Sequence, residues 1–194
     1  PRVPAAGGGR FAPSPETLAM TLRALDICCG AGGLSLGLQR AGFDVQGVDD
    51  NRDAIETHRR HVGPCQWADV RTWLPPSADL CAGGPPCQPF STAGKRRGIE
   101  DPRYLVPDFL RIARMSGARA VLFENVRGLV RKPRDFRIVL AAFEAEWLVT
   151  WTVLNAAHYG VPQQRQRLLV VGFKEPEARA RFRWPAPTHA APGE

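Results

Sequence analysis

The segment Gly83-Gly84-Pro85-Pro86-Cys87-Gln88-Pro89-Phe90-Ser91 presents one thiol between prolines, directly after the apolar run 78–82. Proline fixes its own φ and pushes the preceding residue towards extended geometry, so Pro85 and Pro86 should hold Cys87 in a defined direction. The run should be a strand, and the carboxyl edge of a parallel sheet is where α/β proteins bind ligands. A lone cysteine is most often buried and inert, but a thiol presented in this way is placed to act as a nucleophile.

Acidic residues and glycines at three expected strand ends favour a nucleotide-like cofactor. The first strand runs into Asp26-Ile27-Cys28-Cys29-Gly30-Ala31-Gly32-Gly33-Leu34, where glycines let the backbone approach a ligand closely. Asp49 ends the second strand, where a carboxylate can accept hydrogen bonds from both ribose hydroxyls. Asp69 ends the third, where it can accept one from an adenine amino group. A dinucleotide phosphate site is less favoured, because the spacing is not G-x-G-x-x-G.

Composition places few limits on the partner. The chain of 194 residues fits one domain, and it contains no apolar run of the roughly 20 residues that span a bilayer. No signal-peptide pattern opens it, so we expect an intracellular protein with no membrane partner. The net charge of +7 is compatible with a polyanion partner, although an arginine-rich composition explains it equally well.

The cysteines predict neither a disulfide framework nor a metal site. Five are present, an odd number, and no two form a C-x-x-C pair. We therefore assign no metal ligand from the sequence.

Short β-rich runs alternate with helix-like stretches, which predicts an α/β fold with a mostly parallel sheet and helices on both faces. The last two strands should pair antiparallel, because only a short loop joins them. The expected strands are 22–28, 45–48, 66–68, 79–82, 120–123, 148–155 and 168–173, and the expected helices are 33–41, 53–61, 104–115 and 135–146. Residues 1–19 should be a flexible tail, 20–174 the folded domain, and 175–194 a partly extended exit segment rich in proline.

Over residues 23–174 the chain resembles the cytosine-5 DNA methyltransferases of bacterial modification systems. The resemblance lies in the cofactor turn 26–33, the two acids Asp49 and Asp69, and the nucleophile segment 83–91. It continues, in the family's order, through Asp101-Pro102-Arg103-Tyr104-Leu105, Glu124-Asn125-Val126 and Gln163-Gln164-Arg165-Gln166-Arg167. It implies a Rossmann-like S-adenosylmethionine-dependent methyltransferase fold, with S-adenosylhomocysteine as the product and DNA as the partner.

The resemblance gives Cys87, Glu124 and Arg165 catalytic roles. Carbon 5 of cytosine is too weak a nucleophile to take a methyl group directly, and thiolate attack at carbon 6 makes it electron-rich. Cys87 would attack, Glu124 would protonate or hydrogen-bond ring nitrogen 3, and Arg165 would bind the exocyclic oxygen. No residue is an obvious base for removing the carbon-5 proton, so water could serve.

The remaining assignments concern the cofactor and the DNA. The residues expected to bind the cofactor are Asp26, Cys28, Gly30, Gly32, Gly33, Leu34, Asp49, Asp50, Asp69, Val70, Gly84, Pro85 and Leu105. A duplex hides its bases, so the cytosine must be flipped out, and polar residues should hold the DNA. Those residues are Gln88, Ser91, Lys95, Arg96, Arg97 and Arg167, although the basic triplet could also be a solvated loop tip.

The chain departs from the family in two residues and in length. Cys28 replaces an aromatic residue that often packs on adenine, and Asp49 replaces a longer glutamate. The family continues beyond Pro187-Thr188-His189 into a target-recognition domain and terminal motifs, which predicts a piece or subunit that is incomplete alone. The alternatives are a tRNA cytosine-5 methyltransferase and a non-catalytic module that binds cofactor or nucleic acid. We expect a cytoplasmic protein encoded by a bacterium or phage.

Overall fold

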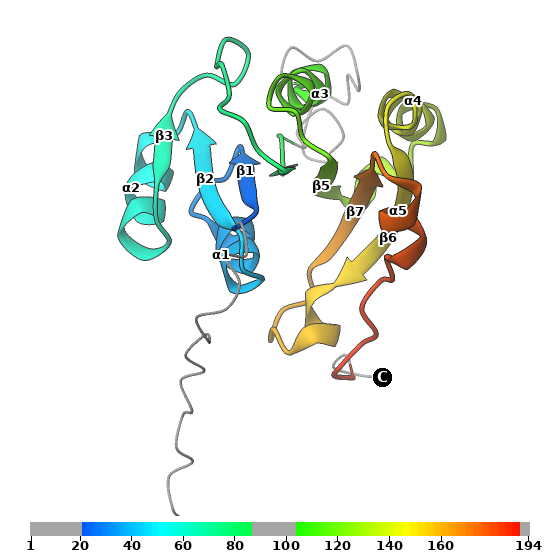
Figure 1. The fold of residues 1–194 in the computed structure, drawn as a ribbon. Coiled ribbons are helices and arrows are strands. Elements are labelled where there is room, and N and C mark those ends of the chain that lie inside the picture. The colour runs from blue at the N-terminus through cyan, green and yellow to red at the C-terminus, as the bar shows by residue number, and fades with distance from the viewer. Residues whose placement is uncertain (1–20, 87–103, 191–194) are drawn as a thin grey trace, which may run out of the picture.

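The computed structural model describes residues 21–86 and 104–190, and within them seven strands form one sheet in the order β3-β2-β1-β4-β5-β7-β6 (Figure 1). All neighbouring strands pair parallel except β7, which is antiparallel to both β5 and β6. This confirms the prediction of a mostly parallel sheet with an antiparallel C-terminal strand. The strands are β1 (Arg23–Ile27), β2 (Asp44–Asp49), β3 (Cys65–Trp67), β4 (Leu80–Gly83), β5 (Ala120–Val126), β6 (Leu148–Asn155) and β7 (Gln166–Phe173).

The helices cover both faces of this sheet, as predicted. They are α1 (Gly33–Arg40), α2 (Arg52–His61), α3 (Val106–Met115), α4 (Pro133–Glu144) and α5 (Pro176–Arg181), with single 3₁₀ turns η2 (Arg127–Leu129) and η3 (Ala156–Tyr159). None of the helices in the described ranges has the length and apolar character needed to cross a membrane.

Side chains alternate between the two faces of the sheet, so the core has two sides. On one side Phe109 of α3, Phe123 of β5 and Phe143 of α4 are fully buried, with ring centroids 5.3 to 5.7 Å apart. On the other side, Leu38 of α1 packs in a smaller cluster with Ala24 and the neighbouring strands. Successive strand residues point to opposite faces, so β1 contributes Leu25 and Ile27 to the larger cluster and Ala24 to the smaller one.

The smaller side leaves an apolar hollow of about 550 Å³ over the C-terminal half of the sheet. Leu122 of β5, Leu169 and Val171 of β7, and Trp184 line it. We call this region the apolar hollow.

The structure corrects three element boundaries that matter for function. β5 runs three residues past the predicted end at Phe123, so Glu124 lies within a strand. The helix predicted from residue 104 begins at Val106. The segment after residue 174 was expected to be partly extended, but α5 forms there because Pro176 stands in the first turn, where proline is tolerated. Phe182 then packs against Phe173 at 5.4 Å between ring centroids.

Candidate active site

The carboxyl ends of the parallel strands meet at one edge of the sheet and surround a cavity of about 280 Å³. We call this the cofactor cavity. Seven residues expected to bind cofactor line it, namely Cys28, Asp49, Asp50, Asp69, Val70, Gly84 and Leu105. Ala68, Arg71 and Pro86 complete the lining and were not assigned from the sequence. The fold therefore brings together residues that are up to 77 positions apart, from 28 to 105.

Asp49 fastens the glycine turn to the end of β2. Its Oδ2 accepts a hydrogen bond from the backbone N–H of Gly30 at 2.8 Å, and its Oδ1 accepts one from that of Asn51 at 2.9 Å. Each carboxylate oxygen has a second lone pair, so the residue can still accept hydrogen bonds from a ligand's hydroxyls. Asp49 thus serves the turn and the cavity together.

Cys28 adopts a left-handed backbone conformation with φ of 56°, the one non-glycine residue with positive φ in the described ranges. Such a conformation is uncommon without glycine and turns the chain sharply at the end of β1. Burial, together with the charges of Asp49, Asp50 and Asp26, raises the pKa of the Cys28 thiol to about 12. The thiol therefore stays protonated at neutral pH, and it lines the cavity as a small, uncharged side chain.

Asp69 also lines the cavity, and its exposed carboxylate pairs with Arg71 at 3.2 Å. The backbone N–H of Arg71 donates to Asp69 Oδ1 at 2.9 Å, and this hydrogen bond lowers the pKa of the carboxyl. Asp69 is therefore ionised at neutral pH and can accept a hydrogen bond from a ligand's amino group.

Five other expected cofactor residues lie in or below the turn and do not line the cavity. Asp26 is fully buried and accepts a hydrogen bond from Ser35 Oγ of α1 at 2.6 Å. Gly32 is pressed against α2, since a Cβ there would lie 2.7 Å from His58 Cδ2. Gly30 is bonded to Asp49, and Gly33 and Leu34 begin α1. The structure thus gives Asp26 a supporting position under the turn.

Glu124 faces two arginines beside this cavity. Its Oε1 lies 2.8 Å from Arg167 Nε and 3.8 Å from Arg165 Nη2. Val126 of β5 pairs with Arg167 of antiparallel β7, which places the Arg167 side chain diagonally from Glu124 on the same face of the sheet. Arg167 is therefore the closer partner, whereas the sequence had assigned the ring contact to Arg165 and a DNA contact to Arg167.

Gly84 joins the two parts of the site. It lines the cofactor cavity, and a Cβ added to it would stand 3.1 Å from Glu124 Oε2. The carboxylate and the cavity are thus separated by a residue with no side chain. No side chain at this position therefore blocks the way from the cavity to Glu124.

Burial raises the pKa of Glu124, while Arg167 and Arg165 oppose that shift without reversing it. A carboxyl group of this kind keeps a proton at a higher pH than a solvated glutamate does. It is suited to share a proton with a ring nitrogen.

Cys87, the nucleophile expected from the sequence, falls outside the described residues, as do Gln88, Ser91, Lys95, Arg96 and Arg97. The structure does describe the chain up to Pro86. The buried Asn125 donates from Nδ2 to the carbonyl of Pro85 at 3.3 Å, which fixes the expected cofactor residue Pro85 against β5. Asn125 lies next to Glu124, so one strand holds both the acid and the segment that leads to Cys87.

Sequence reasoning missed Asn155, which anchors Arg165. The Oδ1 of this buried residue accepts from the backbone N–H of Arg165 at 3.0 Å, and its Nδ2 donates to Gln164 Oε1 at 2.6 Å. An asparagine that ends an apolar strand is a signal that could have identified it, because such residues cap the following turn, and here its side chain accepts a hydrogen bond from the Ala157 N–H.

The donor set of the cofactor cavity suits a nucleoside-bearing cofactor. The carboxylates of Asp49 and Asp50 match ribose hydroxyls, that of Asp69 matches an amino group, and Val70 and Leu105 offer apolar surface to a flat ring. The residues present therefore fit such a group.

Comparison with known proteins identifies the family. The profile of the C-5 cytosine-specific DNA methylases matches residues 22–193. The chain belongs to this family. It is 40% identical over 184 residues to the type II methyltransferase M.NgoMIV of Neisseria gonorrhoeae, covering 89% of this chain and 58% of that protein. It is 33% identical over 196 residues to M.AquIA of Picosynechococcus, covering 88% of this chain and 78% of that protein.

A solved structure of a putative DNA modification methyltransferase from an E. coli prophage has the same fold, with 27% identity and a TM-score of 0.68. The match covers 84% of this chain and 49% of that one. The chain thus spans about half the length of both this structure and M.NgoMIV. Family membership confirms the resemblance drawn from the motifs and implies use of S-adenosylmethionine.

Proposed function

We propose that this chain is the catalytic part of a DNA cytosine-5 methyltransferase, which transfers a methyl group from S-adenosylmethionine to carbon 5 of a flipped-out cytosine. The observation that carries the proposal is the junction at Gly84, where the cofactor cavity meets the Glu124 carboxylate. Membership of the C-5 cytosine-specific DNA methylase family supports the same reaction.

The other cysteines support Cys87 as the nucleophile. Burial raises the pKa of the thiols of Cys28, Cys29, Cys65 and Cys81. A thiol that stays protonated is a poor nucleophile, because the thiolate is the reactive form. Cys87 is the remaining cysteine, and it follows the fixed Pro85-Pro86 pair.

The residues then divide the work of the reaction. The Cys87 thiolate attacks carbon 6 of the ring, and Glu124 gives a proton or hydrogen bond to nitrogen 3, so that carbon 5 becomes electron-rich. Arg165 binds the exocyclic oxygen, while Arg167 holds Glu124 in place. The cofactor supplies the methyl group. Water then removes the carbon-5 proton, the electrons of that bond re-form the double bond between carbons 5 and 6, and the thiolate leaves with the electron pair of the carbon–sulfur bond. A proton given to nitrogen 3 returns to Glu124.

We further propose that the seven assigned residues that line the cavity contact the cofactor, with Asp49 on the ribose and Asp69 on the adenine, and that the other six support the segments around it. Gln88, Ser91, Lys95, Arg96 and Arg97 would hold the DNA around the extruded base. Net charge of +7 is consistent with that role.

Target recognition is proposed to come from protein outside these 194 residues, in the same polypeptide or in a second subunit. Support comes from the share of the relatives that the chain spans and from the apolar hollow on the sheet. M.NgoMIV and M.AquIA are bacterial type II methyltransferases, so we propose that the protein acts in the cytoplasm of a bacterium or of its phage-infected cell.

Transfer of radiolabelled methyl groups to duplex DNA tests this function. We expect transfer near background with the chain alone and a clear rise when a complementary recognition part is added. Cys87→Ala should remove the restored activity, and DNA carrying 5-fluorocytosine should become covalently attached at Cys87. Restored activity that survives Cys87→Ala would exclude the covalent mechanism.

The same assay separates the alternatives. Methyl transfer to tRNA in preference to DNA would indicate a tRNA enzyme. Tight DNA binding without transfer under any condition would indicate a non-catalytic module.

A further inference from the structure

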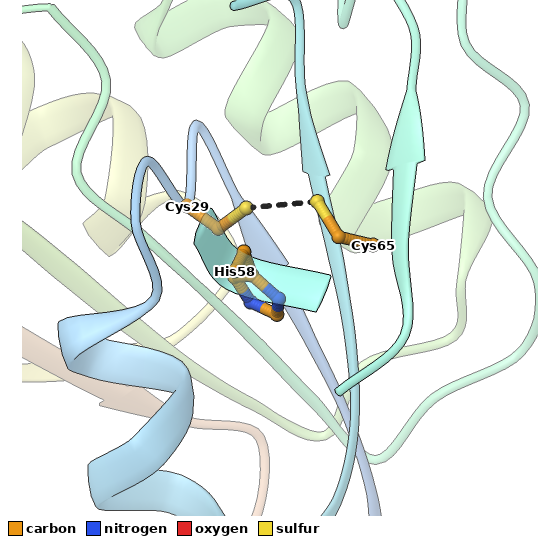
Figure 2. A group of neighbouring side chains, drawn as sticks. All are labelled: Cys29, His58 and Cys65. Atoms are coloured by element: carbon orange, nitrogen blue, oxygen red, sulfur yellow. Dashed lines mark hydrogen bonds between the residues drawn. The ribbon is translucent and has the colours of Figure 1, made fainter. Parts of the chain in front are cut away.

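Behind the cofactor turn, two thiols and an imidazole meet in the interior. The donor atoms of Cys29, His58 and Cys65 all lie within 4.8 Å of one another, and all three residues are buried. Figure 2 shows the two sulfur atoms facing each other with the His58 ring beside them, and the sulfurs are 3.4 Å apart. The methyl-transfer reaction proposed above does not use any of these three side chains.

Three separate elements build this cluster. Cys29 lies in the turn after β1, His58 lies on α2, and Cys65 is the first residue of β3. Cys65 pairs with Gly47 on β2. A Cβ added to Gly47 would lie 2.8 Å from His58 Nε2 and 2.9 Å from Cys29 Sγ. The absence of a side chain at Gly47 therefore allows the nitrogen and sulfur donors to pack directly against this strand.

The hydrogen bonds around His58 leave its Nε2 without a hydrogen-bond donor. Its Nδ1 faces the carbonyl of Gly63 at 3.1 Å, and a carbonyl only accepts, so Nδ1 carries the ring proton. Its Nε2 lies 3.0 Å from Ser35 Oγ, but the single hydroxyl proton of Ser35 is donated to Asp26 at 2.6 Å. In the neutral imidazole, the Nε2 lone pair thus faces an oxygen lone pair. A cation at this position would satisfy both.

We propose that Cys29, His58 and Cys65 form a structural site for a thiophilic divalent cation of the zinc type, which clamps the cofactor turn to α2 and β3. Sulfur and imidazole nitrogen are the donors that Zn²⁺ prefers in structural sites. Two thiolates balance the ion's charge, so the complex is neutral, as a buried position requires. The hydrogen bond from His58 Nδ1 to Gly63 is the outer contact that typically orients a metal-binding histidine.

Two separations between donor atoms lie near the values of a tetrahedral site. Zn–S bonds of about 2.3 Å in a tetrahedron place two sulfurs about 3.8 Å apart, and Zn–N and Zn–O bonds of about 2.0 Å place nitrogen and oxygen about 3.3 Å apart. The observed separations are 3.4 Å between the sulfurs and 3.0 Å between Nε2 and Ser35 Oγ. Ser35 Oγ is the candidate fourth ligand because it lies beside Nε2, and the sulfur-to-nitrogen separations, which are within 4.8 Å, shorten when the ion binds.

Binding releases the two thiol protons, because a coordinated thiol is deprotonated outright. Cys29 donates its backbone N–H to Val48 at 3.2 Å and precedes Gly30, which is bonded to Asp49. An ion on Cys29 consequently stabilises the turn that closes the cofactor cavity. The sequence predicted no metal site because residues 29, 58 and 65 match no short spacing motif, and only the fold brings them together.

Cobalt titration of the chelator-treated, reduced 194-residue chain tests this site. We expect one equivalent of Co²⁺ to give a thiolate-to-cobalt charge-transfer band in the near ultraviolet and the visible bands of tetrahedral cobalt, and Zn²⁺ to displace it. Cys65→Ser should weaken Co²⁺ binding about 100-fold or more, whereas the matched control Cys81→Ala removes a buried cysteine outside the cluster and should bind as the parent does.

The titration of the parent chain decides the question even where Cys65→Ser does not fold. Absence of a saturable charge-transfer band would overturn the proposal, and so would equal binding by folded Cys65→Ser. A Cys29–Cys65 disulfide in the freshly isolated chain, seen as a mass lower by two hydrogens, would also overturn it. Zn²⁺ should in addition raise the melting temperature of the parent and of Cys81→Ala.

Discussion

At the scale of single residues, Glu124 shows how the surroundings of a side chain set its chemistry. A glutamate at a strand end would be solvated and ionised, but here the strand continues and buries it beside Gly84. Burial and the two arginines act in opposite directions on its pKa, and burial has the larger effect. Arg167 Nε lies 2.8 Å from Glu124 Oε1, yet the pKa of Glu124 stays above its ordinary value.

Replacing Glu124 by glutamine should lower the methyl-transfer rate of the complemented enzyme about 10²-fold or more, because an amide cannot deliver a proton to the ring. Single-turnover kinetics with radiolabelled cofactor measure the rate. Glu146→Gln is a matched control, since Glu146 is also half-buried and paired, with Arg114, but lies away from the site. An equal loss in both variants would show that the effect is not specific to Glu124.

Asp26 should make stability depend on pH. Burial, followed by the charges of Asp49 and Glu124, outweighs the Ser35 hydrogen bond and raises its pKa from 3.8 to about 6. Its Oδ1 has no hydrogen-bond partner within the described residues. Because the folded-state pKa is the higher one, the stabilising contribution of the protonated carboxyl is complete below pH 3.8 and is lost as the pH rises through 6.

Asp26→Asn removes this titration. Relative to the parent, the variant should gain about 2 kcal/mol in free energy of unfolding between pH 4 and pH 7. Urea denaturation in zinc-free buffer with a chelator measures the difference. A constant difference across this range would contradict the assigned pKa shift.

At the scale of elements, close contact between neighbouring strands positions the site. Gly83 ends β4 beside Ile27 of β1, and a Cβ at Gly83 would lie 2.3 Å from the Ile27 carbonyl oxygen. Both strands then turn away into the two segments that form the site, one with the glycine turn and the other with Cys87. The spacing between β1 and β4 therefore fixes how far the cofactor lies from the nucleophile.

Gly83→Ala should force these strands apart and cost about 1–3 kcal/mol of stability. Gly37→Ala is the matched control, because Gly37 lies in α1 with no atom within 4 Å of the added Cβ. Alanine should stabilise that helix by about 0.5–1 kcal/mol. Thermal unfolding of both variants measures the loss of stability in Gly83→Ala and the gain in Gly37→Ala. An unchanged stability of Gly83→Ala would contradict the close packing of β1 and β4.

At the scale of the whole molecule, cofactor binding and folding should be coupled, since the cavity draws on β1, β2, β4 and the start of α3. At a fixed concentration of 100 times the Kd of the parent chain, S-adenosylhomocysteine should raise the parent's free energy of unfolding by about 2.7 kcal/mol. Asp49→Asn should reduce this gain, because an amide has one acceptor oxygen. Asp44→Asn, at the exposed opposite end of β2, should keep it. Denaturation with and without ligand decides, and an undiminished gain in Asp49→Asn would remove Asp49 from the cofactor site.

The sequence by itself determined the α/β order of elements, the glycine turn and the acids at the strand ends, and it predicted the nucleophile segment, which lies outside the described residues. These features are local, because a strand end, a tight turn or a proline pair is set by residues adjacent in the chain. The carboxyl ends of parallel strands meet at one edge of the sheet. For this reason Asp49 and Asp69, which were expected at strand ends, line one cavity.

Tertiary structure alone decided which side chains touch. The register of antiparallel β7 against β5 made Arg167, rather than Arg165, the close partner of Glu124. The packing of α2 on β2 and β3 brought Cys29, His58 and Cys65 into one cluster. Both outcomes depend on contacts between residues that are distant in the chain. The free energy of these contacts comes from burial of apolar surface, which the local sequence does not show.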